Sequence, residues 1–459
     1  MSDMAKDHLK APEVLAKNGL GHPSSAVAQA FALFDGAVYL GASAPRASTA
    51  EDAARIFRHL PDGASWTPCY TAAPRRLDAA AEARLAARRP LADATGAPET
   101  LAEAFGITCF APFEGKGDGL TRLYAGTASL FGPGLLRSGP GGAFEDISAP
   151  PFAEGDIATG ALQSFQGRLY AAPRGEITAE IDEAAAPRTA RLYASDDPAD
   201  PESWQQASRP GFGTDLPGEI VALCATHGHL YAATACARKG FALWRTEGGE
   251  SLPHNWTQVL EAGAFRFAQN MMAASLCAFG DHLYIGTGIP GLGAARTIDV
   301  AEAAPELLRI AADGTWDVVV GTTRISPDGL KVPLSAQGPG FDDPFNAAIS
   351  ALVEHDGALY AGTQNWAPYA AIHAGEGVPL QGGFQLWRSL DGESWEPVLD
   401  EGAGEVTETG IRAMISTEAG LWIGTERHTP LMRLIDRMAG GARTELAAAS
   451  TGFSVLKLA

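Results

Sequence analysis

Acidic, basic and amide side chains recur at fixed distances from a repeated aromatic residue in this chain. Side chains of these types bind polar ligands or transfer protons. The positions fourteen residues before the aromatic residue are Ser25, Phe110, Asp156, Pro217, Asn270, Asn346 and Glu408. A second group follows the repeated segment and consists of Arg174, Gln364, Asn365, Trp366, Glu426, Arg427 and His428. Five of the first seven residues are polar, which is unusual for positions that adjoin a packed core.

These residue types indicate two kinds of chemistry. Carboxylates and histidine act as acid and base when burial tunes their pKa values, so Glu426, His428 and Asp156 are candidate catalytic residues. Arginine holds a carboxylate or phosphate through paired hydrogen bonds, and amides add further contacts. The candidate ligand-binding residues are Asn270, Asn346, Glu408, Gln364, Asn365, Arg412, Arg427 and Arg174. The alternative is that these polar groups hold buried waters and cap strand ends.

The repeated segment is a short strand that contains an aromatic residue and ends on small residues. Clear copies span residues 123–127, 283–287, 359–363 and 421–425, and weaker copies span residues 38–41, 169–172 and 230–234. A repeat with a period of tens of residues is typical of units that bury their hydrophobic faces only by stacking on neighbours. We therefore expect one domain over residues 1–459 rather than several.

The unit at residues 346–399 shows the internal order of the repeat. Apolar runs at 348–353, 359–363, 384–389 and 395–399 are separated by a turn at Asp356-Gly357, a long loop, and a turn at Asp391-Gly392. Asp-Gly between apolar runs is a strong hairpin signal. Four antiparallel strands joined as a meander form one propeller blade. The sequence therefore predicts an all-β fold, a seven-bladed β-propeller of four-stranded antiparallel blades.

The two ends of the chain indicate how the ring closes. Residues 13–19 resemble the fourth-strand segments at 258–263 and 397–402, so residues 1–24 are expected to supply a clasp strand and a lead-in to blades over 25–459. The alternative is that residues 443–446 fill this place. Insertions are expected near 75–103, which contains a short helix within 77–88, and near 290–305 and 323–344.

A propeller brings the polar residues to one place. The starts of the inner strands lie around the mouth of the central channel, and the segments after the second strands return to the same face. We therefore expect a small polar molecule or a peptide to bind there. The open alternatives are a binding protein and an enzyme, namely a hydrolase or lyase acting on a sugar or a modified peptide.

Residues 389–395 (SLDGESW) resemble the Asp-box hairpin of sialidase-like β-propellers. The segment departs from that pattern because Gly392 follows Asp391 directly and Trp395 comes one residue early. The resemblance implies the propeller fold and a structural role on the outer part of a blade. It does not imply sialidase activity, which needs an arginine triad. Arg245, Arg309, Arg388 and Arg433 recur, but in expected third strands away from the channel.

The bulk composition limits the partners. A formal net charge of −20 argues against nucleic acid or an anionic membrane as a partner, since both attract basic surfaces. The five cysteines show no CxxC spacing, and the chain has no signal-peptide pattern or apolar run of membrane-spanning length. We therefore expect a cytoplasmic protein with free thiols.

The sequence identifies no cofactor. It contains neither a P-loop nor a dinucleotide fingerprint. The histidines at 227, 229, 282 and 355 fall at turns on the opposite face, without the spacing of zinc ligands. Acidic residues at 342–343 and 196–200 could bind calcium, but they do not match an EF-hand loop. No metal site is therefore expected.

Overall fold

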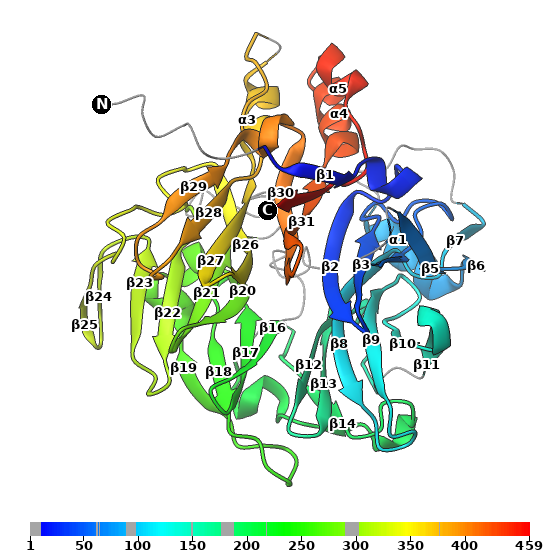
Figure 1. Cartoon of the computed structure of the whole chain (residues 1–459), viewed down its shortest axis with the longest axis vertical. Coiled ribbons are helices and arrows are strands. Elements are labelled where there is room, and N and C mark those ends of the chain that lie inside the picture. Colours follow the sequence, from blue (N-terminus) through cyan, green and yellow to red (C-terminus); the bar gives the residue numbers. More distant parts are fainter. Residues whose placement is uncertain are drawn as a thin grey trace.

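A computed structural model describes residues 11–60, 63, 65–88, 98–147, 150–175, 188–216, 218–289, 303–375 and 377–459. The chain forms a ring of seven antiparallel four-stranded blades (Figure 1). The first strand of each blade contacts the first strands of both neighbouring blades, so these strands form the inner wall of a closed ring. The seven-bladed propeller predicted from the sequence is confirmed.

The first four blades follow in chain order. Their strands are β2 (Val27–Phe34), β3 (Ala37–Ser43), β4 (Arg55–His59), β5 (Trp66–Thr71); β8 (Gly106–Glu114), β9 (Thr121–Ala128), β10 (Leu135–Ser138), β11 (Phe144–Ile147); β12 (Ala158–Phe165), β13 (Arg168–Arg174), β14 (Tyr193–Ser195), β15 (Gln205–Gln206); and β16 (Glu219–Thr226), β17 (His229–Ala235), β18 (Leu243–Thr246), β19 (Thr257–Leu260).

Blades 5, 6 and 7 complete the ring. Their strands are β20 (Met272–Phe279), β21 (His282–Gly288), β22 (Leu307–Ala311), β23 (Trp316–Val320); β26 (Asn346–His355), β27 (Ala358–Asn365), β28 (Leu386–Ser389), β29 (Glu396–Leu399); and β30 (Glu408–Thr417), β31 (Gly420–Arg427), β32 (Val455–Leu458) with β1 (Glu13–Ala16).

Tight turns connect the first two strands of most blades. In blade 1, Asp35 and Gly36 both have positive φ, 48° and 68°, as the favoured two-residue hairpin turn requires. Blade 2 differs because a longer connection joins β8 to β9. Phe110 therefore lies in the middle of β8 and not at its start, so the fourteen-residue count does not apply in this blade.

The clasp closes blade 7. β1 pairs antiparallel with β32, with Val14 opposite Leu456, and the Lys457 ammonium lies 2.9 Å from the Glu13 carboxylate. The N-terminal clasp is thus confirmed. The alternative was wrong because residues 443–446 lead into helix α5 (Thr444–Ala448). Arg433 was also misplaced, since it lies in helix α4 (Thr429–Met438) and not in a third strand.

Helices and small hairpins are inserted between the strands. The helix expected within residues 77–88 is present as α1 (Ala79–Arg88), and residues 290–302 lie outside the described part of the chain. The other inserted elements are β6 (Pro74–Arg76), β7 (Thr100–Ala102), α2 (Ala262–Phe265), β24 (Arg324–Ser326), β25 (Gly329–Lys331) and α3 (Ala367–Ala374), with 3-10 turns at Asn18–Gly21, Pro140–Gly142, Pro201–Ser203, Pro210–Gly213, Phe267–Asn270 and Glu401–Gly404.

The hydrophobic core is divided among the interfaces between blades. One cluster joins Tyr231 and Leu243 of blade 4 to Ile285 and Trp316 of blade 5. Five of the six repeated tyrosines are buried at these interfaces, Tyr231 being only 1% exposed, and Tyr360 is half-buried. Large aromatic side chains bury much apolar surface, which explains why the repeat keeps one in every blade.

A left-handed turn leads from several fourth strands to the next inner strand. Its central residues include Gly19, Gly263 and Gly402, with φ near 61° in each case. The backbone N–H of each glycine donates a hydrogen bond to a carbonyl just before a third strand. A Cβ on Gly263 would lie 2.9 Å from the carbonyl oxygen of Asn270, so the close approach and the positive φ both require glycine here.

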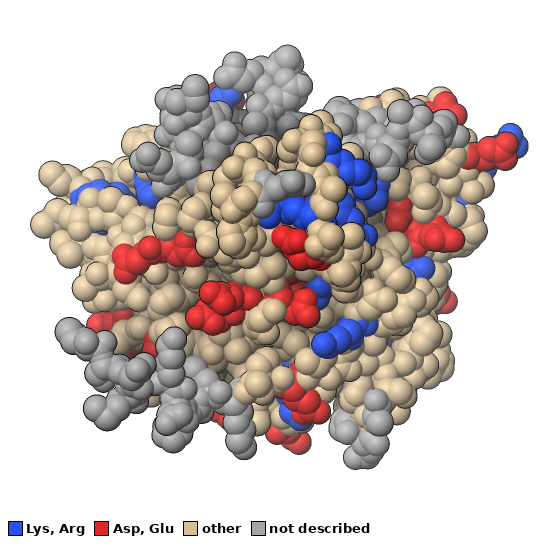
Figure 2. All heavy atoms as spheres, turned by 90° about the horizontal axis from the view of Figure 1, so that it is seen from above, with Lys and Arg blue, Asp and Glu red and all other residues tan. Residues whose placement is uncertain are grey.

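The surface carries charges of both signs. Figure 2 shows acidic and basic side chains in small groups on the side that lies at the top of Figure 1, where α3, α4 and α5 are found.

Within the described residues, no helix has the length and apolar character needed to cross a membrane.

Candidate functional site

The polar residues at the starts of the inner strands are buried inside their blades. Asn270 and Asn346 have no exposed surface, and Asp156 and Glu408 are 1% and 2% exposed. Four of them hydrogen-bond to a residue at or near the start of the third strand of their blade. The hydrogen-bonded pairs are Ser25–Arg55, Asp156–Arg191, Asn270–Glu306 and Asn346–Gln385. These contacts brace the inner strands of blades 1, 3, 5 and 6 against their third strands, whereas Glu408 bonds to Arg427 at the end of the second strand of blade 7.

The two asparagines also hold the turns that precede them. The Asn270 amide donates to the carbonyl of Gly263 at 3.0 Å, and the Asn346 amide donates to the carbonyl of Gly340 at 2.8 Å. Asn365 donates to the side-chain oxygen of Asn346 at 3.0 Å. Protein groups therefore occupy the amide atoms that were expected to contact a ligand. This agrees with the alternative interpretation, in which these polar side chains cap strand ends.

Glu408 and Arg427 form a buried ion pair within blade 7. The Arg427 guanidinium donates to the Glu408 carboxylate and to Thr407 Oγ1, the latter at 3.0 Å. Burial raises the pKa of Glu408, although the positive charge of Arg427 opposes this effect. A buried pair of this kind fixes geometry and leaves Arg427 poorly placed to receive an outside carboxylate.

Asp156 lies in blade 3, apart from the other two candidate catalytic residues. It accepts hydrogen bonds from Arg188 and Arg191, and Arg188 also bonds to Glu219 at the start of blade 4. This network links two neighbouring blades. Arg174, at the end of β13, belongs to the same blade and is half-buried.

Four predicted residues do come together where blades 6, 7 and 1 meet. Glu426 Oε1 lies 2.5 Å from His428 Nε2, and the Gln364 amide donates to the other carboxylate oxygen of Glu426. His428 Nδ1 lies 3.0 Å from the hydroxyl of Tyr369 in α3. Arg412, the fourth predicted residue, adds its positive charge near Glu426. A carboxylate, an imidazole and a phenol thus form a continuous hydrogen-bonded chain.

The charges of this chain fix the direction of its hydrogen bonds. Burial alone would raise the pKa of Glu426, but His428, Arg412 and Gln364 together lower it to about 2. The ionised carboxylate accepts a hydrogen bond from His428 Nε2–H. When the ring carries both protons, Nδ1–H donates to the Tyr369 oxygen and leaves the phenolic proton free. Burial raises the pKa of Tyr369 well above its ordinary value, and the charge of Glu426 adds to this, so the phenol stays protonated. The chain can therefore present a phenolic proton donor backed by an imidazole.

A β-bulge recurs in the inner strand of every blade. Every inner strand has a register shift at the equivalent position. A bulge redirects the side chain of the extra residue. The bulged residues, in chain order, are Gln29, Thr108, Gly160, Val221, Ala274, Ser350 and Arg412. Polar ones occupy blades 6, 7, 1 and 2, whereas small or apolar ones occupy blades 3, 4 and 5.

Arg412 and Gln29 are joined across the boundary between blades 7 and 1. With the Gln29 amide oriented so that its oxygen faces the guanidinium, that oxygen accepts from Arg412 Nε at 2.9 Å and Nη2 at 3.3 Å. The Arg412–Gln29 pair thus adjoins the Glu426–His428–Tyr369 chain, since the charge of Arg412 also acts on Glu426.

Sequence reasoning missed Tyr369 and Gln29. Tyr369 lies in α3, in a segment that was expected to be a loop, although a signal for a helix was present. Both α3 and α4 directly follow a second strand and carry proline, Pro368 and Pro430, in their first turns. Proline is favoured at such positions because its fixed φ suits a helix start.

Among the described residues, no group of three or more histidine, cysteine or acidic side chains is arranged to hold a metal ion.

No known family model matches this chain, and no curated protein matches it. Similar solved structures include the GH74 xyloglucanase from Xanthomonas campestris, with 16% identity over 89% of this chain and 53% of that chain and a TM-score of 0.47. PorZ of Porphyromonas gingivalis, a surface component of the type-IX secretion system, has 12% identity over 93% and 46% and a TM-score of 0.46. This chain spans about half the length of these two proteins.

A third similar structure is the propeller domain of the Trilobed protease from Pyrococcus furiosus, with 9% identity over 87% of this chain and 92% of that chain and a TM-score of 0.38. These are similarities of fold. The class that the architecture defines is the β-propeller.

Proposed function

We propose that this protein binds a small polar ligand at the channel mouth, on the wall formed by blades 6, 7 and 1. The observation that carries the proposal is the segregation of the bulged residues. The polar bulged residues lie in blades 6, 7, 1 and 2, and Gly160, Val221 and Ala274 occupy blades 3, 4 and 5. Ser350 and Thr108 already donate to backbone carbonyls of the next inner strand, so Arg412 and Gln29 are the residues proposed to meet a ligand. Such a wall suits a ligand that has an acceptor group at one end and an apolar part at the other.

Arg412 is the expected contact for the acceptor group. Its guanidinium has five donors in a planar fork, and Gln29 engages those on Nε and Nη2. The hydrogen bonds to Gln29 hold the fork in one orientation, which reduces the entropy lost on binding. A carboxylate or a sugar hydroxyl group is the chemistry that this arrangement recognises.

The test is a ligand-observed NMR screen of monosaccharides, uronic acids, amino acids and dicarboxylates, followed by titration of the hits. Arg412→Ala should abolish the titratable binding, because the oriented donors are lost. Arg388→Ala is the matched control, since Arg388 lies on the outer strand β28 in an exposed pair with Glu396. Equal binding by wild type and Arg412→Ala would contradict the proposal, as would a screen without hits.

The Glu426–His428–Tyr369 chain supports a second candidate, a hydrolase or lyase acting on a sugar or a modified peptide. A protonated phenol backed by an imidazole and a carboxylate is a suitable general acid. In this case, with glycosides and modified peptides added to the screen, Tyr369→Phe should remove turnover of those that wild type converts while leaving their binding intact. Loss of binding and turnover together would favour a structural role for Tyr369 in holding α3.

A further inference from the structure

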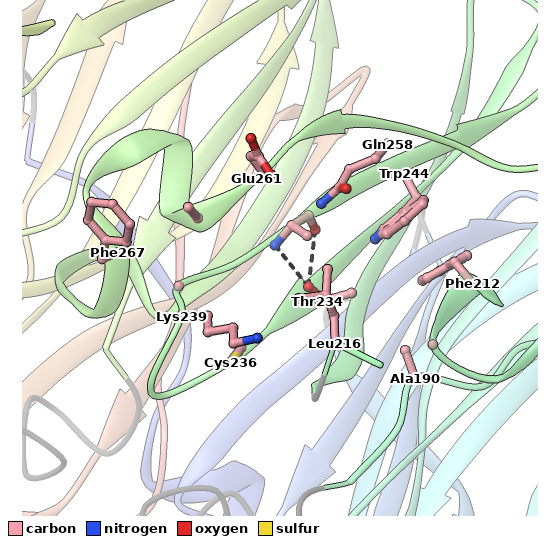
Figure 3. A pocket seen from close by; sticks show the side chains of 14 residues that line it. Ala190, Phe212, Leu216, Thr234, Cys236, Lys239, Trp244, Gln258, Glu261 and Phe267 are labelled. Atoms are coloured by element: carbon pink, nitrogen blue, oxygen red, sulfur yellow. Dashed lines mark hydrogen bonds between the residues drawn. The ribbon is translucent and has the colours of Figure 1, made fainter. Parts of the chain in front are cut away.

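A cavity lies between blades 3 and 4, away from the wall of blades 6, 7 and 1. Its volume is about 320 Å³, and Figure 3 shows the side chains around it. Phe212 and Leu216 come from the segment before blade 4, whereas Trp244 and Gln258 come from β18 and β19. Lys239 is exposed at the rim. The cavity is mostly apolar and has a few polar groups, which is the usual make-up of a small-molecule site.

Comparison with blade 6 explains why the cavity exists. Phe212 stacks on Trp244 with ring centroids 4.7 Å apart, and Phe341 stacks on Trp387 in the same way at 4.5 Å. The stack is therefore part of the repeat. In blade 6, Gln385 stands just before the third strand and accepts a hydrogen bond from the indole nitrogen of Trp387 at 3.1 Å.

Blade 4 has Ala242 at the position that Gln385 occupies in blade 6. The smaller side chain leaves the space that forms the cavity. It also leaves the indole N–H of Trp244 without a hydrogen-bond acceptor among the described residues. Figure 3 shows the indole nitrogen turned toward the cavity.

A second donor faces the same space. Gln258 lies opposite Trp244 in the strand pairing, where blade 6 has Pro397 opposite Trp387. The amide nitrogen of Gln258 is buried and has no hydrogen-bond partner. A buried donor without a partner is unfavourable, so a ligand that supplies an acceptor there would relieve this cost. Thr234, in contrast, is already engaged with the backbone of Ala242.

The volume of the cavity and its hydrogen-bond donors together indicate the chemical class of the ligand. An apolar cavity of about 150 Å³ holds one benzene ring, so this one has room for a ring and a polar head group. Trp244 and Gln258 both present hydrogen-bond donors to the cavity, and the one on Gln258 is buried without a partner. Of the two exposed charged side chains that line the cavity, Lys239 attracts a carboxylate and Glu261 repels it. We infer that this cavity binds a compact carboxylate with an aromatic or alicyclic body, its carboxylate accepting from Trp244 and Gln258.

The experiment is isothermal titration of the full chain with benzoate and with cyclohexanecarboxylate. Wild type should bind at least one of them saturably. Ala242→Gln introduces the residue that blade 6 already accommodates beside its own stacked tryptophan, so it should fill the space, engage Trp244 and abolish binding. Arg412→Ala should leave this binding unchanged, which separates this inference from the proposed function at the channel mouth.

Two further variants keep the test decisive if Ala242→Gln does not fold. Trp244→Phe keeps the stack but removes the N–H donor, and it should weaken binding about 2- to 10-fold, as expected for one hydrogen bond. Lys239→Ala should weaken benzoate more than neutral benzamide. Absence of saturable binding to wild type, or unchanged benzoate affinity in folded Ala242→Gln or Trp244→Phe, overturns the inference.

Discussion

At the scale of single residues, the structure separates two groups of polar side chains that the sequence places together. Asn270, Asn346 and Glu408 are buried and bonded within their blades, whereas Glu426 and His428 form a chain that reaches α3. The first group stabilises the blade ends. The second group has the composition of an acid–base site. The contribution of its charges to stability can be measured as a function of pH.

We expect Glu426→Gln to change how stability depends on pH. The pKa of Glu426 in the folded protein is lowered from 4.5 to about 2, because the attraction of His428, Arg412 and Gln364 outweighs burial. A depressed carboxyl pKa stabilises the folded state above the unfolded value, and this contribution disappears as pH falls from about 4.5 toward 2. Thermal melts of Glu426→Gln should show a lower Tm at neutral pH and a shallower decline in acid than wild type.

Glu396→Gln is the control, since Glu396 is 60% exposed in its pair with Arg388 and screened by solvent. A pH profile of Glu426→Gln that parallels wild type would show that the carboxylate gains nothing from its partners.

At the scale of elements, the left-handed glycine turns connect one blade to the next. Gly263→Ala should destabilise the protein strongly, because the new Cβ would lie 2.9 Å from the carbonyl oxygen of Asn270 and φ is +61°. Gly280→Ala is a matched control with φ +55° and nothing within 4 Å of the new Cβ. We expect Gly280→Ala to lower the free energy of unfolding by about 1–2 kcal/mol from the left-handed conformation alone, and Gly263→Ala by more.

Urea denaturation at equilibrium measures both variants. Equal losses would mean that the backbone relaxes around the turn and that the contact with Asn270 has little effect on stability.

The sequence predicts the strands of the blades and the clasp strand well, but it predicts poorly where their side chains point. The Asp-Gly turns and the repeated tyrosines were sufficient for the blades, and the likeness of residues 13–19 to two fourth strands was sufficient for the clasp. Spacing locates the start of an inner strand, but it does not show whether Asn270 faces the channel or its own third strand. That choice depends on Glu306, thirty-six residues away in the chain.

At the scale of the whole molecule, the net charge of −20 dominates the electrostatics. Like charges on a compact surface repel one another, and added salt screens this repulsion. We expect Tm to rise when sodium chloride is increased from low to near-molar concentration, as followed by differential scanning calorimetry. A Tm that falls with salt would show instead that local ion pairs, such as Arg188 with Asp156 and Glu219, contribute more than the overall repulsion.

The pairing of β1 with β32 has a consequence for synthesis on the ribosome. β1 is made before all seven inner strands, yet its partner strand β32 is made after them. At ordinary translation speeds the early strand waits on the order of tens of seconds with an open hydrogen-bonding edge. Six blades can assemble during that interval, but the seventh cannot, so a nascent chain stays an open arc until β32 emerges.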